Sequence, residues 1–334
     1  MSALLVFAVV PAARLDATVL ADGEGLPPGL RSITVGPLAA VVGAAPEGGL
    51  KGREREVLLP WLLSSQKVME RLLACTPVLP VALGTVVTGE DRVRHLLHGG
   101  AGVLLEALDT VGDRVQMDLS VQWHLDAVVA RLLADVAADL RQAAAGGDEA
   151  ARKAVGTLLA TAVAEERRKV KDRLIAGLRA ATCDLIISEP TEPGGVVNLA
   201  LLVERGTDDA VLEVLNALDA AFEGVLNFRL VGPLPPYSFA SVHVHLACAE
   251  TVRRACAALG VEPGAGPEAV KTAYRRAARA LHPDLASAGE SFDSAPVGEE
   301  TRDAARFVAL SDAYRVLEAE HAPVSLRRQE TSPG

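Results

Sequence analysis

The tripeptide His282-Pro283-Asp284 is the strongest candidate for a partner-binding site in this chain of 334 residues. It directly follows a segment, 267–281, whose apolar residues recur at the spacing of a single helix face. These residues are Val270, Tyr274, Ala277 and Leu281. Beside that face the same segment carries a basic stripe with a cation at every fourth position: Lys271, Arg275 and Arg279. Because Pro283 ends the helix, His282 and Asp284 are expected at its mouth, where they would face a protein partner instead of a substrate.

A second helix is expected to close this segment into an antiparallel hairpin. Its apolar face is predicted from the spacing of Phe307, Leu310, Tyr314 and Leu317. The alternative interpretation is that the tripeptide only stops a helix and caps it locally. A stop requires the proline alone, so the partner-binding interpretation is favoured.

Together these patterns resemble a J domain, the module by which co-chaperones engage Hsp70-type chaperones. The matching residues are the Leu259-Gly260-Val261 start, Ala273-Tyr274-Arg275-Arg276, His282-Pro283-Asp284, Phe307 and Ala313–Leu317. The resemblance implies that Lys271, Arg275, Arg276 and Arg279 meet an acidic chaperone surface. It also implies that His282 and Asp284 help to trigger ATP hydrolysis in the chaperone. Leu285 stands where a basic residue is common, and the loop 286–299 is long.

A second cluster has residue types that could hold a metal ion. His243 and His245 alternate on a predicted strand, and Cys248 and Cys256 follow, so four zinc ligands are available. The spacing H-x-H-x2-C-x7-C matches no zinc signature. The favoured interpretation is an exposed strand face followed by two buried thiols, with no metal and no cofactor.

A third candidate is the proline-rich segment Gly232–Phe239. Pro233, Pro235 and Pro236 each lack a backbone donor and hold φ near −65°, which makes the segment stiff. Such a segment forms either a rigid corner that fixes one strand or a recognition surface, since a stiff segment loses little freedom on binding. The residues alone do not separate these two interpretations.

The elements that position these sites indicate an α+β fold with two α+β lobes, the second ferredoxin-like, joined by long helices and followed by the hairpin. Leu4–Val10 predicts a strand buried on both faces. We expect one strand over 78–87, a half-exposed strand over 115–123 and two long helices over 124–181. The expected domains are 1–123 (N-terminal lobe), 124–250 (helices and ferredoxin-like lobe), 251–322 (J-like hairpin) and 323–334 (disordered tail).

Composition excludes several classes of function. A net charge of −10 disfavours a nucleic-acid binder. No run of about 18 or more apolar residues predicts a membrane-spanning helix, and four scattered cysteines suit a reducing cytoplasm. The usual nucleophile, phosphate-loop, dinucleotide and zinc-protease motifs are missing. We therefore expect no catalytic residue and no enzymatic activity.

The body of the chain resembles the gas vesicle protein F/L family. Its proline-rich segment, Gly232-Pro233-Leu234-Pro235-Pro236-Tyr237-Ser238-Phe239, is similar to the family's G-P-W-P-P-Y-S-F. The stretches 4–10, 37–42 and 78–86 agree in order and spacing, and the resemblance covers roughly residues 1 to 250. Leu234 replaces the usual Trp, Ala82 a basic residue and Leu83 a Phe, and Leu83 is expected to fill a core position.

This resemblance implies a non-enzymatic cytoplasmic protein associated with gas vesicles. Its expected partners are the hydrophobic major shell protein, other gas vesicle accessory proteins and, through the J-like tail, an Hsp70-type chaperone. The expected role is therefore an assembly factor that binds the shell protein and recruits the chaperone. The alternative is a minor structural component of the shell whose J-like tail is inert.

Overall fold

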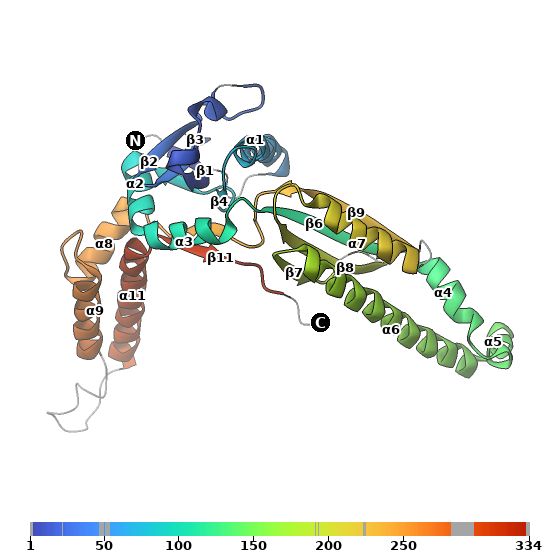
Figure 1. Cartoon of the computed structure of the whole chain (residues 1–334). Helices are drawn as coiled ribbons and strands as arrows, with labels where there is room; N and C mark the ends of the chain where they lie inside the picture. The colour runs from blue at the N-terminus through green and yellow to red at the C-terminus, as the bar shows by residue number, and fades with distance from the viewer. Residues whose placement is uncertain are drawn as a thin grey trace. The chain divides into compact units, whose positions relative to one another are not determined.

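The computed structural model describes residues 3–21, 23–46, 50, 54–190, 192, 194–222, 225–281 and 297–331. The chain divides into two compact units (Figure 1). Unit 1 combines Met1–Thr110 with Ser241–Leu326, and unit 2 combines Val111–Ala240 with Arg327–Gly334. These units differ from the expected domains, because the J-like segment shares a unit with the N-terminal lobe.

The sheet of unit 1 is built around a central strand, β1 (Ala3–Pro11), which pairs antiparallel with three other strands. Its side chains from Leu4 to Val10 are all buried, which confirms the strand predicted from this apolar run. The strand order is β2-β3-β1-β4, and β5 also pairs with β1. The other strands are β2 (Arg31–Val35), β3 (Leu38–Ala44), β4 (Leu79–Pro80) and β5 (Val86–Thr88).

The segment 78–87 is not the single strand predicted from its sequence. It forms the two short strands β4 and β5 on either side of a turn at Leu83-Gly84, where Gly84 has a φ of 79°. Such a positive φ suits glycine because it has no Cβ. Leu83 lies at the tip of the turn and is 61% exposed, so the expectation that it fills a core position is wrong.

Among the described residues, unit 1 has three α-helices in its N-terminal segment, where α1 lies between β3 and β4, and three in its C-terminal segment. The first set is α1 (Arg55–Leu73), α2 (Glu90–Gly99) and α3 (Ala101–Val111). The second set is α8 (Ala249–Leu259), α9 (Pro267–Leu281) and α11 (Val297–His321). Short 3-10 helices η1 (Ala12–Arg14) and η2 (Ala17–Leu20) follow β1.

The expected disordered tail instead contains a strand. β11 (Val324–Arg327) pairs with β10 (Ser241–Val244), and the backbone N–H of His245 donates to the carbonyl oxygen of Pro323 at 2.9 Å. A parallel bridge between Val81 and Val242 continues this pairing toward β4. The segment that follows α11 is therefore held by backbone hydrogen bonds, which its polar composition does not reveal.

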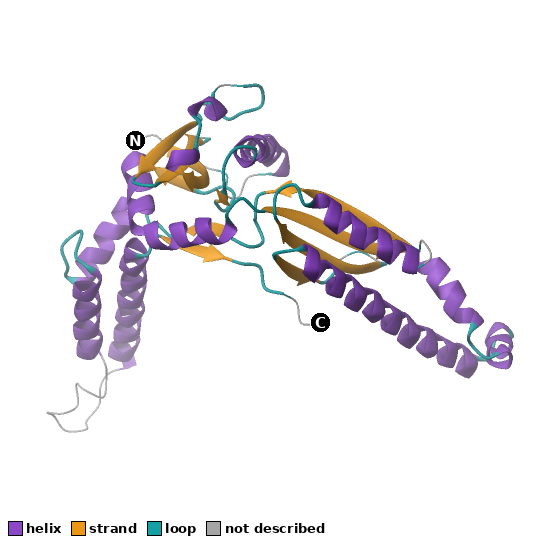
Figure 2. Ribbon diagram, in the orientation of Figure 1, coloured by secondary structure: helices purple, strands orange, loops and turns teal. Residues whose placement is uncertain are grey.

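Unit 2 has a four-stranded antiparallel sheet in the order β7-β8-β6-β9. Figure 2 shows strands in orange and helices in purple. The strands are β6 (Val115–Trp123), β7 (Asp184–Ser188), β8 (Gly195–Val203) and β9 (Leu226–Leu234). With helices between β6 and β7 and between β8 and β9, the order is the β-α-β-β-α-β of a ferredoxin-like fold. β6 was expected at the end of the N-terminal lobe. It lies in the middle of this sheet, and most of its side chains are buried.

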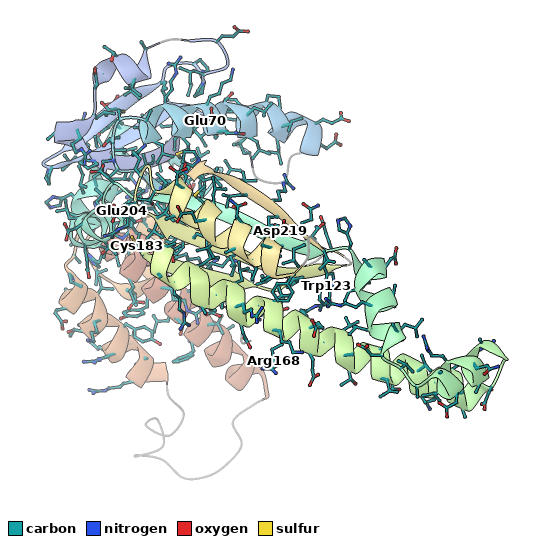
Figure 3. All side chains as sticks on the ribbon, turned by 45° about the vertical axis from the view of Figure 1, so that its right-hand side comes forward. Glu70, Trp123, Arg168, Cys183, Glu204 and Asp219 are labelled. Atoms are coloured by element: carbon teal, nitrogen blue, oxygen red, sulfur yellow. The ribbon has the colours of Figure 1, made fainter. Side chains whose placement is uncertain are left out.

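Three helices, instead of the expected two, connect β6 to β7: α4 (Leu125–Ala134), α5 (Ala138–Ala145) and α6 (Glu149–Ala181). The break between α5 and α6 falls at Gly146-Gly147. Asp148 then caps α6 by accepting from the N–H groups of Ala150 and Ala151. Figure 3 shows Trp123 at the end of β6 and Arg168 on α6, which lies beside the sheet with α7 (Asp208–Ala221).

Candidate partner-binding surfaces

Helices α8, α9 and α11 pack around one small core, and we refer to these three helices as the J-like arm (Figure 1). The arm therefore has three described helices, where the sequence predicted a two-helix hairpin. Gly260 ends α8 in the left-handed conformation with a φ of 65°. The buried members of the core are Ala255, Cys256, Leu259, Val270, Leu310, Ala313 and Leu317.

An aromatic pair fixes α9 against α11. The rings of Tyr274 and Tyr314 are stacked with centroids 4.5 Å apart, and the Tyr274 hydroxyl lies 3.3 Å from Oγ of Ser311. The prediction that Tyr274 and Tyr314 lie on facing apolar surfaces is consistent with this stack. Phe307 was expected on the same surface of α11, but it is 41% exposed and lies outside the core.

The basic residues of α9 lie away from that core. Val270 and Ala273 are buried, whereas Arg275, Arg276 and Arg279 are exposed and Lys271 is half-buried. We call Lys271, Arg275, Arg276 and Arg279 the basic face. Exposed cations gathered on one face of a helix attract an acidic partner and orient its approach.

The tripeptide His282-Pro283-Asp284 lies outside the described residues. Helix α9 ends at Leu281, the residue that directly precedes it in the chain.

An ion pair fastens the last turn of α11 to α2 within unit 1. Nη1 and Nη2 of Arg92 donate to the two carboxylate oxygens of Glu320 at 2.6 and 2.8 Å. Nη2 also donates to the carbonyl oxygen of Ala247 at 2.7 Å, and the N–H of Ala247 donates to Glu320 at 3.2 Å. The Arg92 and Glu320 side chains are only 26% and 12% exposed. This group, which we call the anchor, ties α2 both to the end of the J-like arm and to its beginning.

The anchor holds its carboxylate ionised. Burial alone would raise the pKa of Glu320, but the hydrogen bonds and charge of Arg92, with the N–H of Ala247, outweigh burial and lower it. The pKa of Arg92 is raised, chiefly by its hydrogen bonds to Glu320. Nε2 of His95 lies 3.0 Å from the carbonyl oxygen of Glu320, which adds a second contact from α2.

The proline-rich segment forms a fixed corner in unit 2. Gln116 of β6 is 2% exposed, and it accepts from the N–H of Ser238 at 2.8 Å while its amide lies 3.1 Å from the Ser238 hydroxyl. Phe239 is buried beside Ile186, and the guanidinium of Arg328 lies over its ring. These contacts favour the corner interpretation for Ser238 and Phe239.

Other residues of this segment face outward. Gly232 and Pro233 are exposed, and they are joined by a cis peptide bond. Pro235 and Pro236 are buried, whereas Tyr237 is 41% exposed, and partial burial raises the pKa of its hydroxyl. The recognition interpretation therefore applies at most to the exposed side of the corner, around Pro233 and Tyr237.

The four possible zinc ligands do not converge. His245 contacts Ser325, Cys248 contacts Thr251, and Cys256 is buried in the core of the J-like arm. Across the part of the chain that the structure describes, no three His, Cys, Asp or Glu side chains are arranged to hold a metal ion. Cys248 is exposed, which differs from the expected pair of buried thiols.

Sequence reasoning missed both members of the anchor and Gln116. Arg92 and Glu320 lie 228 positions apart on polar helix surfaces, so no local pattern links them. Gln116 had a local signal, because a polar residue in a buried strand requires a hydrogen-bonding partner.

In the described residues, no helix combines the length and apolar character needed to span a membrane.

Residues 3–241 match the family model described as gas vesicle synthesis protein GvpL/GvpF, and residues 257–322 match the DnaJ domain model. Gas vesicle protein F of Streptomyces sp. (strain CB03234) is 30% identical over 225 residues, which are 65% of this chain and 90% of the relative. Gas vesicle protein L of the same organism is 28% identical over 232 residues, which cover 65% of this chain and 85% of the relative.

Solved structures agree on the fold of the body. The crystal structure of GvpF from Anabaena sp. PCC7120 superposes with a TM-score of 0.59 at 18% identity, covering 71% of this chain and 98% of that one. GvpF from Microcystis aeruginosa gives 0.54 at 17% identity with the same coverage. The resemblance of the body and that of the tail are thereby confirmed.

Proposed function

Because this chain belongs to the gas vesicle GvpL/GvpF family and carries a J domain, we propose that it is a non-enzymatic assembly factor. It binds the major gas vesicle shell protein and recruits an Hsp70-type chaperone to it. The observation that carries the proposal is the anchor, through which Arg92 and Glu320 fasten the J-like arm to the N-terminal part of the family body. A helical arm held in this way stands at a fixed position relative to whatever that part of the body binds.

The chaperone half of the proposal rests on the basic face. The chain as a whole carries a net charge of −10, whereas α9 carries four cations and a single acidic residue, Glu268. The basic face suits an acidic chaperone surface, because complementary charge raises the rate of encounter and fixes orientation. His282 and Asp284 then act at the end of that helix to stimulate ATP hydrolysis in the chaperone.

The shell-protein half rests on family membership and on the physics of assembly. A free shell subunit is strongly hydrophobic, and exposed apolar surface of that kind drives aggregation. A cytoplasmic protein that covers this surface until polymerisation keeps the subunit available. Other gas vesicle accessory proteins are further candidate partners of the same body.

The chaperone half is tested by the ATPase rate of an Hsp70-type chaperone in the presence of the full chain. We expect stimulation by the wild type and its loss in His282→Gln and in the Arg275→Ala/Arg279→Ala double variant. Arg254→Ala is the matched control, because Arg254 is an exposed cation on α8 of the same arm and lies outside the basic face. Equal rates for wild type and His282→Gln would reject recruitment and leave a minor shell component with an inert tail.

A further inference from the structure

Near the start of α1, the two turns Val57–Leu63 consist only of apolar residues, which lie on all sides of the helix. Val57, Leu59, Leu62 and Leu63 are 43, 52, 40 and 53% exposed, and Trp61 is half-buried. A helix that is apolar all round is normally buried, because no side of it favours water. These turns therefore carry much more apolar surface than unit 1 itself covers.

The later turns of α1 behave differently. Val68, Met69, Leu72 and Leu73 are each at most 4% exposed and pack into the unit, while polar residues such as Glu70 face water. Within this one helix, Val57–Leu63 is therefore a wholly apolar segment with several exposed side chains, whereas the later turns are amphipathic. The second half of the helix packs into the core of unit 1, whereas Val57, Leu59, Leu62 and Leu63 in the first half stay outside that core.

A hollow of about 400 Å³ lies beside these turns. It is lined by Leu50, Leu58, Trp61, Leu62, Leu83 and Gly84. Hydrogen bonds fix the turn that carries Leu83. The N–H and the hydroxyl of Thr85 both donate to the carbonyl oxygen of Ala82, and the N–H of Ala82 donates to the carbonyl oxygen of Val242. A hollow with a preformed wall accepts an inserted side chain at a low entropic cost.

The charge pattern limits what can occupy this surface. No charged residue lies between Glu56 and Lys67 in α1, and none of the described residues that line the hollow is charged. A charged group buried there would have no partner, which is strongly unfavourable. These described residues therefore suit an occupant that is uncharged and apolar where it contacts them.

We propose that this surface, which we call the α1 apolar surface (Val57–Leu63 with Leu83), binds an apolar segment of the major shell protein. The inference rests on the proposed function and names the part of the body that performs it. A second copy of this chain is the less suitable occupant. A two-fold contact places the same patch of both subunits against each other, so in a dimer the hollow of one copy would have to be filled by the α1 apolar surface of the other.

The test is capture of the co-expressed major shell protein by the tagged full-length chain. The variants are Leu59→Asp/Leu63→Asp and Leu83→Asp, with Leu158→Asp and Leu212→Asp as controls, because Leu158 and Leu212 are exposed leucines of unit 2 (51 and 43%). We expect the surface variants to retain at least about tenfold less shell protein, equivalent to about 1.4 kcal/mol. The controls should match the wild type, and Leu59→Met/Leu63→Met should also retain it, since methionine keeps the surface apolar.

Failure of this inference and failure of the proposed function give different results. If the wild type captures shell protein and the Asp variants capture it equally well, the α1 apolar surface is not the binding site, although the proposed function stands. If the wild type captures none, both are rejected. If the Asp variants instead turn a dimer into a monomer in sedimentation and still capture shell protein, the surface pairs two copies of this chain, which also overturns the inference.

Discussion

Replacing Arg92 by methionine should loosen the J-like arm from the rest of unit 1. Arg92→Met keeps most of the aliphatic stem but removes three hydrogen bonds, two to Glu320 and one to Ala247. Breaking a buried pair from one side costs about 3–5 kcal/mol. With the two side chains 26% and 12% exposed, solvent screens part of this, and we expect a loss of about 2 kcal/mol in the free energy of unfolding.

For a unit of this size that loss lowers the melting temperature by about 4–8 °C, measurable by calorimetry on the full chain. The control is Arg94→Met, because the Arg94–Glu90 pair is exposed and should contribute at most about 0.5 kcal/mol. Adding Glu320→Leu to Arg92→Met should recover part of the loss, because no unpaired carboxylate remains. Equal melting temperatures for Arg92→Met and Arg94→Met would refute the anchor.

The same pair predicts a pH dependence. Glu320 has a pKa below its ordinary value of 4.5, so its ionised form contributes stability above that pH. The contribution is lost as the pH falls through the lowered pKa. The difference in unfolding free energy between wild type and Arg92→Met should therefore be full at neutral pH and shrink in acid. A difference that grows as the pH falls below 4.5 would contradict this assignment.

Two further predictions concern unit 2. Deleting residues 327–334 removes Arg328, whose hydrogen bonds to Asp184 are the main cause of that carboxyl's lowered pKa. Carboxyl NMR should show the pKa of Asp184 rising in the deletion variant, and an unchanged pKa would reject the contact. Gln116→Leu should destabilise the full chain by about 1–3 kcal/mol in denaturant unfolding, because it leaves the half-buried N–H of Ser238 without its Gln116 acceptor. A neutral effect would show that the corner does not depend on Gln116.

Local patterns in the sequence predicted much of the fold. The apolar run at Leu4–Val10 and the helix–strand order after residue 150 led to the buried strand and the ferredoxin-like lobe that the structure contains. They could not assign β6 to its sheet, because its central place depends on pairing with β8 and β9, which lie far along the chain. The N-terminal lobe was consequently extended to 123.

The candidate sites divide in the same way. The basic stripe of α9 has helical periodicity and could be read directly, whereas the anchor joins residues from opposite ends of the chain. The exposed apolar residues of α1 could not be predicted, because periodicity does not distinguish a helix face that packs into its own core from one that stays exposed. Leu83 shows the same limit, because its place in an apolar run predicts a core position, whereas a turn places it outside the core.

The most direct test of the central claim is the solubility of the shell protein. Shell subunits diluted from denaturant are mixed with the full chain, an Hsp70-type chaperone and ATP, and the soluble fraction is measured after centrifugation. The account predicts that the wild type keeps the shell protein in solution and releases it when chaperone and ATP are present. His282→Gln should keep it in solution but fail to release it. Shell protein that sediments equally with and without this chain would contradict the account.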